Sequence, residues 1–69
     1  MAEKYFVAAL FTKGKKTMFV GYGLTRDKAI ENALERSRKM GGPPREKDFE
    51  KVDVVRGAGK MPRTLGGDR

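Results

Sequence analysis

The chain has no cysteine and no histidine among its 69 residues. Without cysteine it has neither disulfides nor thiolate metal sites, and without histidine it lacks both the commonest metal ligand and the side chain that titrates near neutral pH. Long apolar runs are also missing, because the run from Tyr5 to Phe11 is much shorter than a membrane span and too aromatic for a secretory signal. We therefore expect a cytoplasmic protein with no metal, no cofactor and no membrane contact.

Catalytic patterns are missing as well. The acidic residues are scattered among Lys and Arg, which is typical of solvated surfaces, and no nucleophile has a candidate base beside it. The segment GAGK, Gly57 to Lys60, does not fit a phosphate-binding loop, because Val54 and Met61 occupy the positions of its first glycine and its Ser or Thr. We expect a protein that is not an enzyme and has no small-molecule substrate.

Positive charge is what the sequence has in excess. Sixteen Lys and Arg against nine Asp and Glu give a net charge of +7. Residues 1–35 carry +2 of this charge and residues 36–69 carry +5. Because such a field concentrates polyanions near the protein, nucleic acid, DNA or RNA, is the leading expected partner. The alternative is a protein-binding module that inhibits or adapts a larger machine such as a polymerase, or that forms a homodimer.

Apolar, strand-forming residues predict two strands, residues 4–12 and 17–23, joined by a lysine-rich hairpin loop. Thr25 then predicts the N-cap of a helix, with an apolar stripe that runs from Ala29 to Ser37. The pair Gly41-Gly42, followed by two prolines, ends this helix. The hairpin and the helix are expected to pack on one another.

A third strand, residues 51–56, is predicted by the alternation of Val52 and Val54 with charged residues, and Phe49 anchors the polar segment before it. If this strand lies parallel to one of the hairpin strands, the crossover should be right-handed. The fold class is therefore α+β, a β-β-α-β domain with one sheet covered by one helix. Residues 1–56 are expected to form this single domain, and residues 57–69, which include four glycines, are expected to be a flexible basic tail.

The segment GYGLTRDKAIENAL, from Gly21 to Leu34, resembles the strand-to-helix half of double-stranded-RNA-binding domains. It is similar as well to the corresponding part of plant ethylene-response-factor DNA-binding domains and of the arm-binding domain of lambda-type integrases. The resemblance implies nucleic-acid binding near the helix start, where Arg26-Asp27-Lys28 stands in place of a Lys-Lys pair. A purely structural interpretation explains the same glycines and alanines by a close approach of helix and strand.

The residues expected to contact phosphates lie in the hairpin loop and near both ends of the helix. They are Lys13, Lys15, Lys16, Arg26, Lys28, Arg36, Arg38 and Lys39. Several elements could then act on one polyanion. A lysine-rich loop is also an ordinary means of keeping a protein soluble, so the pattern alone leaves both interpretations open.

A single helix covers only one side of a sheet, and both sides of the first strand are apolar. The uncovered side shows either Tyr5, Phe11 and Tyr22, or Phe6 and Phe19. We take the first set as the candidate protein interface, because an apolar sheet face serves more often as a protein contact than as a surface for bases. Exposed aromatics between lysines can also stack on unpaired bases.

Overall fold

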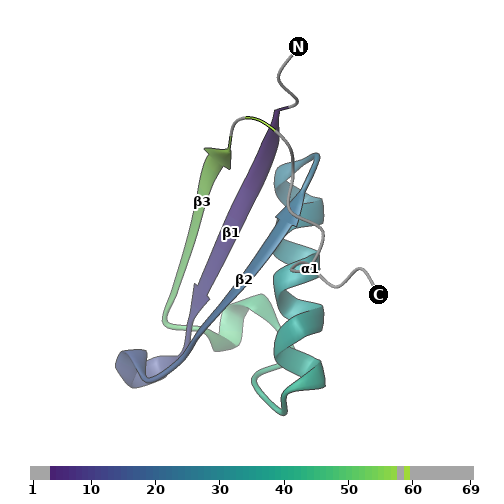
Figure 1. Cartoon of the computed structure of the whole chain (residues 1–69). Coiled ribbons are helices and arrows are strands. Elements are labelled where there is room, and N and C mark those ends of the chain that lie inside the picture. Colours follow the sequence, from purple (N-terminus) through teal and green to yellow (C-terminus); the bar gives the residue numbers. More distant parts are fainter. Residues whose placement is uncertain (1–3, 58, 60–69) are drawn as a thin grey trace.

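The computed structural model describes residues 4–57 and 59, and at Lys15 only the backbone. It contains a three-stranded antiparallel sheet and one α-helix (Figure 1). Their order is β1 (Tyr5–Phe11), β2 (Met18–Gly23), α1 (Arg26–Lys39) and β3 (Lys51–Gly57), with short 3-10 helices η1 (Lys13–Lys15) and η2 (Glu46–Asp48) in the connections. The predicted α+β fold and its β-β-α-β order are confirmed.

Strand β1 is the centre of the sheet, whose strand order is β2-β1-β3. It runs antiparallel to both neighbours, so that Ala8 pairs with Gly21 on one side and with Val54 on the other. Consequently β3 is parallel to β2, and α1 connects these two strands across the one between them. Strand β3 ends at Gly57, one residue beyond its predicted end. The predicted tail otherwise lies outside the described residues, apart from Gly59.

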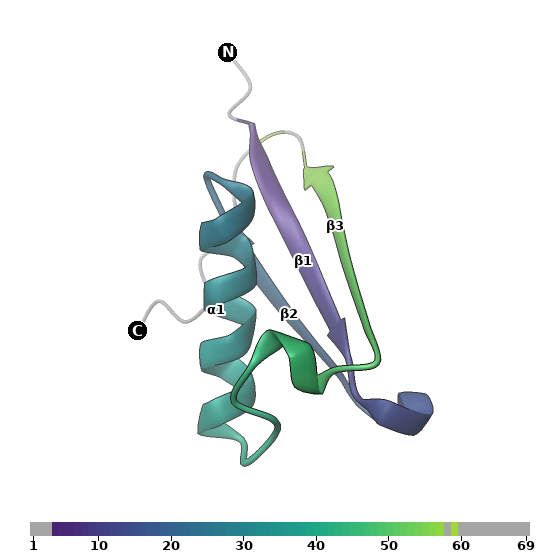
Figure 2. The ribbon, with the colours of Figure 1, turned by 180° about the vertical axis from the view of Figure 1, so that it is seen from behind.

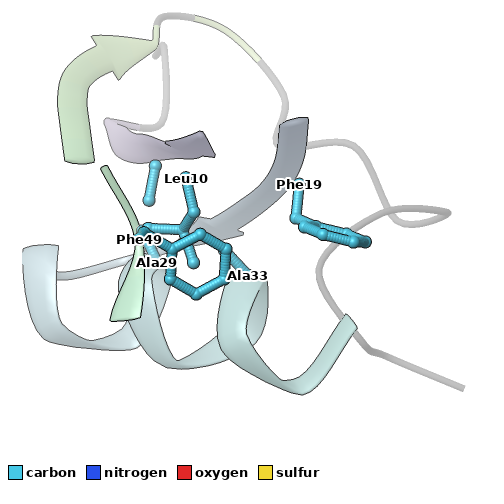
Figure 3. Close-up of a cluster of buried hydrophobic side chains, with 6 residues drawn as sticks. Leu10, Phe19, Ala29, Ala33 and Phe49 are labelled. Carbon is cyan, nitrogen blue, oxygen red and sulfur yellow. The ribbon is translucent and has the colours of Figure 1, made fainter. Parts of the chain in front are cut away.

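The core lies between the sheet and α1. Successive residues of a strand point to opposite sides, and the side that carries Ala8 and Leu10 is the one that α1 covers. Leu10 is completely buried there, and the ring of Phe19 meets that of Phe49 edge-on at a centroid distance of 6.3 Å. Figure 3 shows these side chains gathered between strand and helix. As predicted, Phe49 anchors the segment that leads into β3.

Helix α1 lies directly on the backbone of β2. A Cβ atom added to Gly21 would stand 2.6 Å from the carbonyl oxygen of Ala29, and one added to Gly23 would stand 2.5 Å from the amide nitrogen of Ala29. Ala29 and Ala33 are fully buried in this contact. The side chain of Asn32 adds a hydrogen bond, because its Nδ2 donates to the carbonyl oxygen of Tyr22 at 2.5 Å. The fold therefore supports the structural interpretation, in which these glycines and alanines allow the helix and the strand to approach closely.

Both ends of α1 are capped by local hydrogen bonds. At the start, the amide of Lys28 donates to the Oγ1 of Thr25 at 3.0 Å, which is the predicted N-cap. At the end, Gly41 has a φ of 80° and the amide of Gly42 donates to the carbonyl of Ser37 at 2.7 Å. These bonds form a Schellman motif, which reverses the chain direction after the helix. The helix boundaries thus follow from the residues at its two ends.

The contact between α1 and β2 predicts that Gly21→Ala unfolds or strongly destabilises the protein. Replacing glycine by alanine inside a strand ordinarily gains about 0.5–1 kcal/mol. Here the new methyl group would meet helix backbone, and overpacking costs about 1–3 kcal/mol or more. The clash therefore outweighs the gain, and the free energy of unfolding falls. Thermal unfolding followed by circular dichroism measures the effect. Val20→Ala, the neighbouring position on the opposite side of β2, is the control, and equal melting temperatures for the two variants would contradict the prediction.

Candidate nucleic-acid interface

The chain brings three basic segments to the same end of the molecule. The hairpin loop follows β1, helix α1 runs back antiparallel to β2, and residues 40–50 then lead to the start of β3 (Figures 1 and 2). The hairpin loop, the last turn of α1 and the segment with η2 therefore lie at the same end of the molecule. We call residues 12–17 and 36–51 together the basic end.

The basic end carries the whole net charge of the described residues. It holds nine Lys and Arg against three Asp and Glu, a net charge of +6. The remaining described residues hold four basic and four acidic groups and are neutral in sum. Charge of one sign gathered on one surface raises the local concentration of a polyanion much more than the same charge spread evenly. The fold thus converts a weak asymmetry along the sequence into a strong one in space.

Within the hairpin loop, backbone hydrogen bonds fix the positions of the lysines. Gly14 has a φ of 80°, a left-handed conformation that glycine adopts without strain. The amide of Thr12 donates to the carbonyl of Thr17 at 2.9 Å, which closes the loop. Lys13 and Lys16 are exposed on either side of Gly14. The loop therefore presents Lys13 and Lys16 from a defined turn.

Glu50 ties this loop to the segment that precedes β3. Its Oε1 accepts a hydrogen bond from the amide of Gly14 at 2.8 Å, and its own amide donates to the carbonyl of Phe11 at 2.8 Å. The two parts of the basic end are thereby held in register. Glu50 also places one negative charge among the lysines, so it serves the structure at some electrostatic cost to anion binding.

The last turn of α1 supplies the second group of cations, Arg36, Arg38 and Lys39. Each favours the helix by lying near the negative end of its dipole, so their presence has a structural reason too. The Nε of Arg38 donates to the carbonyl oxygen of Pro44 at 3.2 Å, which orients its guanidinium group over the turn after the helix. Lys39 is exposed. The cations of this turn thus serve the helix and also add to the basic end.

Arg26 and Lys28 lie at the opposite end of the molecule. They belong to the first turn of α1, with Asp27 between them, whereas the basic end begins at the last turn. A helix of 14 residues is roughly 21 Å long, so about this distance separates the first turn from the cations of the last turn. The eight predicted phosphate contacts therefore form two separate groups, six at the basic end and two at the helix start.

The second feature is the side of the sheet that α1 does not cover, which we call the open face. Among the described residues, α1 and η2 lie on the other side of the sheet (Figure 2). The apolar residues of the open face are Tyr5, Val7, Ala9, Phe11, Met18, Val20, Tyr22 and Val55. Met18 and Val55 are 51% and 59% exposed. Of the two sets that the sequence left open, Tyr5, Phe11 and Tyr22 are the ones on this face.

The aromatic residues of the open face stand at its two ends. The rings of Tyr5 and Tyr22 lie 6.0 Å apart at one end, and Tyr5 is buried there because it also packs against Gly57. Phe11 stands at the other end, beside the basic end, with the ammonium of Lys51 6.0 Å from its ring centre. The open face and the basic end are therefore contiguous at Phe11.

Some of the interface was not found in the sequence. The sequence pattern did not place Arg45, Lys47, Glu50 or Lys51 beside the hairpin loop, because the segment before β3 gave no sign of which neighbour it would have. The position of this segment follows only indirectly from the sequence. It requires the antiparallel pairing of β3 with β1, which brings residue 50 to the hairpin loop. Only the strand order decides that pairing.

Among the described residues there is neither a metal-binding cluster nor a membrane-spanning helix. In residues 4–57 and 59, no group of three or more His, Cys, Asp or Glu is placed to hold a metal ion. Helix α1 has 14 residues, and the described chain offers no helix of the length and apolar character that a membrane crossing needs.

Comparisons with models of protein families, with curated proteins and with solved structures found no match to this chain. The local resemblance of Gly21 to Leu34 to nucleic-acid-binding domains therefore stays a prediction. Fold and surface define the chain as a small α+β domain with a charged end and an apolar sheet face.

The hydrogen bond between Glu50 and the hairpin loop predicts different effects for two substitutions. Glu50→Ala removes the acceptor of the Gly14 amide and should lower the free energy of unfolding by about 0.5–1.5 kcal/mol. Glu50→Gln keeps a carbonyl oxygen at the same place and should cost much less. Urea unfolding compares the two variants. Equal losses of stability would show that the charge of Glu50, rather than its hydrogen bond, holds the loop.

Proposed function

We propose that this protein binds nucleic acid through the phosphate backbone and has no catalytic role. The observation that supports the proposal is the net charge of +6 at the basic end, set against the neutrality of the remaining described residues. Phosphate contacts by Lys and Arg supply most of the affinity of non-specific binding. A protein with this function needs a cationic surface and no reactive group, and the cytoplasm that the sequence suggests contains both DNA and RNA.

The geometry of the basic end suits a strand of phosphates better than a single anion. Its cations come from three separate elements, the hairpin loop, the last turn of α1 and the segment around η2. Contacts of this kind position a protein on nucleic acid without reading the bases. We therefore propose binding with little sequence preference.

A matched pair of double variants tests which group of cations holds the phosphates. Lys13→Ala with Lys16→Ala removes two charges from the basic end, and Arg26→Ala with Lys28→Ala removes two from the other end. Binding to duplex DNA should show a slope of log affinity against log salt of about 0.9 per phosphate contacted. The hairpin variant should flatten this slope by about one to two units and weaken binding to all sequences alike. The helix variant should change the slope much less.

Fluorescence anisotropy with labelled duplexes over a range of salt concentrations measures both slopes. Equal effects of the two double variants would mean that net charge alone, and not the basic end, determines binding. If the parent protein binds neither DNA nor RNA at low salt, the nucleic-acid proposal is wrong. The protein-binding alternative predicted from the sequence would then take its place.

A second matched pair adds charge in place of removing it. Glu50→Gln and Glu31→Gln each raise the net charge by one, the first within the basic end and the second on the exposed middle of α1. A charge about 10 Å from a phosphate contributes about 0.4 kcal/mol in water before screening. Glu50→Gln should therefore tighten binding about twofold at low salt, and Glu31→Gln should have a smaller effect. Tighter binding by the Glu31 variant than by the Glu50 variant would show that the phosphates lie away from the basic end.

A further inference from the structure

We propose that the open face binds unpaired bases, so that the preferred ligand is a single-stranded polynucleotide whose phosphates lie along the basic end. This inference rests on the proposed function, because it assigns a second surface to the same ligand. Sheet faces that carry aromatic rings between cations can stack bases without regard to sequence, and each stacked base adds substantially to affinity.

Two rings of the open face are placed for stacking. Phe11 and Tyr22 are each partly exposed on the face, whereas Tyr5 is buried against Tyr22 and Gly57 and supports its neighbour's ring. Phe11 pairs with Met18, four residues before Tyr22 on β2. At about 3.4 Å per residue the two rings are roughly 14 Å apart, so they would hold two different bases.

Charge favours a polyanion at the end of the open face that adjoins the basic end. Asp53 is the acidic residue that β3 adds to the face, and its Oδ2 lies 3.6 Å from the ammonium of Lys51. The two charges of this pair cancel, so the open face itself is neutral in sum. Lys51 in turn stands over the ring of Phe11, so a base stacked on that ring would have a cation beside its phosphate. The residue that follows Phe11 is Thr12 of the hairpin loop, where the basic end begins.

A second copy of the chain is a weaker candidate for this surface. Three strands of about seven residues make a face roughly 23 Å long and 10–15 Å wide, which gives a contact of roughly 300 Å². A stable protein interface buries about 800 Å² on each partner. Two copies, each with a net charge of +7, would also repel one another. A polynucleotide strand has the opposite charge and gains the contacts of the basic end as well.

Intrinsic fluorescence gives a direct test, because the chain has no tryptophan and its two tyrosines, Tyr5 and Tyr22, both lie on the open face. The probes are a uridylate strand of about a dozen nucleotides, a strand of equal length with abasic sites, and an RNA duplex. The uridylate strand should quench the tyrosine emission strongly. The abasic strand and the duplex offer phosphates without free bases, so they should bind and leave the emission nearly unchanged.

Substitutions of the two rings test the energy of stacking. Phe11→Leu and Tyr22→Leu keep an apolar side chain, and each should weaken binding of the uridylate strand about five- to tenfold. Binding of the abasic strand and of the duplex should not change, and circular dichroism spectra like that of the parent show that the variants are folded. Leu24→Ala, which removes exposed aliphatic surface outside both the open face and the basic end, is the control and should bind all three probes as the parent does.

The outcomes separate this inference from the proposed function. If all three probes bind with equal affinity, without quenching and without an effect of the leucine variants, the open face does not stack bases and the phosphate contacts stand alone. If no probe binds, both proposals fail. Sedimentation completes the test, because a dimer of the free protein that Tyr22→Leu dissociates would assign the open face to a second copy and overturn the inference.

Discussion

The contact between the backbone of β2 and that of α1 is the constraint on which the rest of the structure depends. Gly21 and Gly23 leave no room for a side chain, and the small Ala29 and Ala33 fill the helix side of the contact. Because α1 is held this close to β2, at the edge of the sheet, the remaining side of the core is filled from another element. The loop after the helix supplies Phe49 for this purpose.

The same placement of α1 produces both candidate surfaces. The helix runs antiparallel to β2, so its basic last turn and the segment after it return to the end of the molecule that carries the hairpin loop. The positive charges of three segments therefore lie at one end. Since one helix covers one side of the sheet, the other side keeps its aromatic and aliphatic residues open. Glu50 and Lys51 connect the two surfaces, because the first bonds to the hairpin loop and the second lies over Phe11.

Much of the fold could be predicted because its signals are local. Thr25 caps a helix through the hydrogen bond that its own hydroxyl accepts, and Gly41 ends it through a positive φ, and both depend on a few neighbouring residues. The candidate site was harder to predict from the sequence. Arg26 and Lys28 looked equivalent to the hairpin lysines in the sequence, yet they lie at the other end of α1. The spacing of residues along the chain does not give their distance in space, because α1 carries the chain from one end of the molecule to the other.

The sequence by itself determined the element order, the helix boundaries, the close approach of helix and strand, and an excess of positive charge in the second half of the chain. Only the tertiary structure decided that β1 lies in the centre of the sheet, which side of it α1 covers, and that six of the predicted contacts share one end. These features depend on pairing between β1 and β3, whose paired residues are 40 to 52 positions apart. Such pairing is selected by packing of the whole core, and no local pattern encodes it.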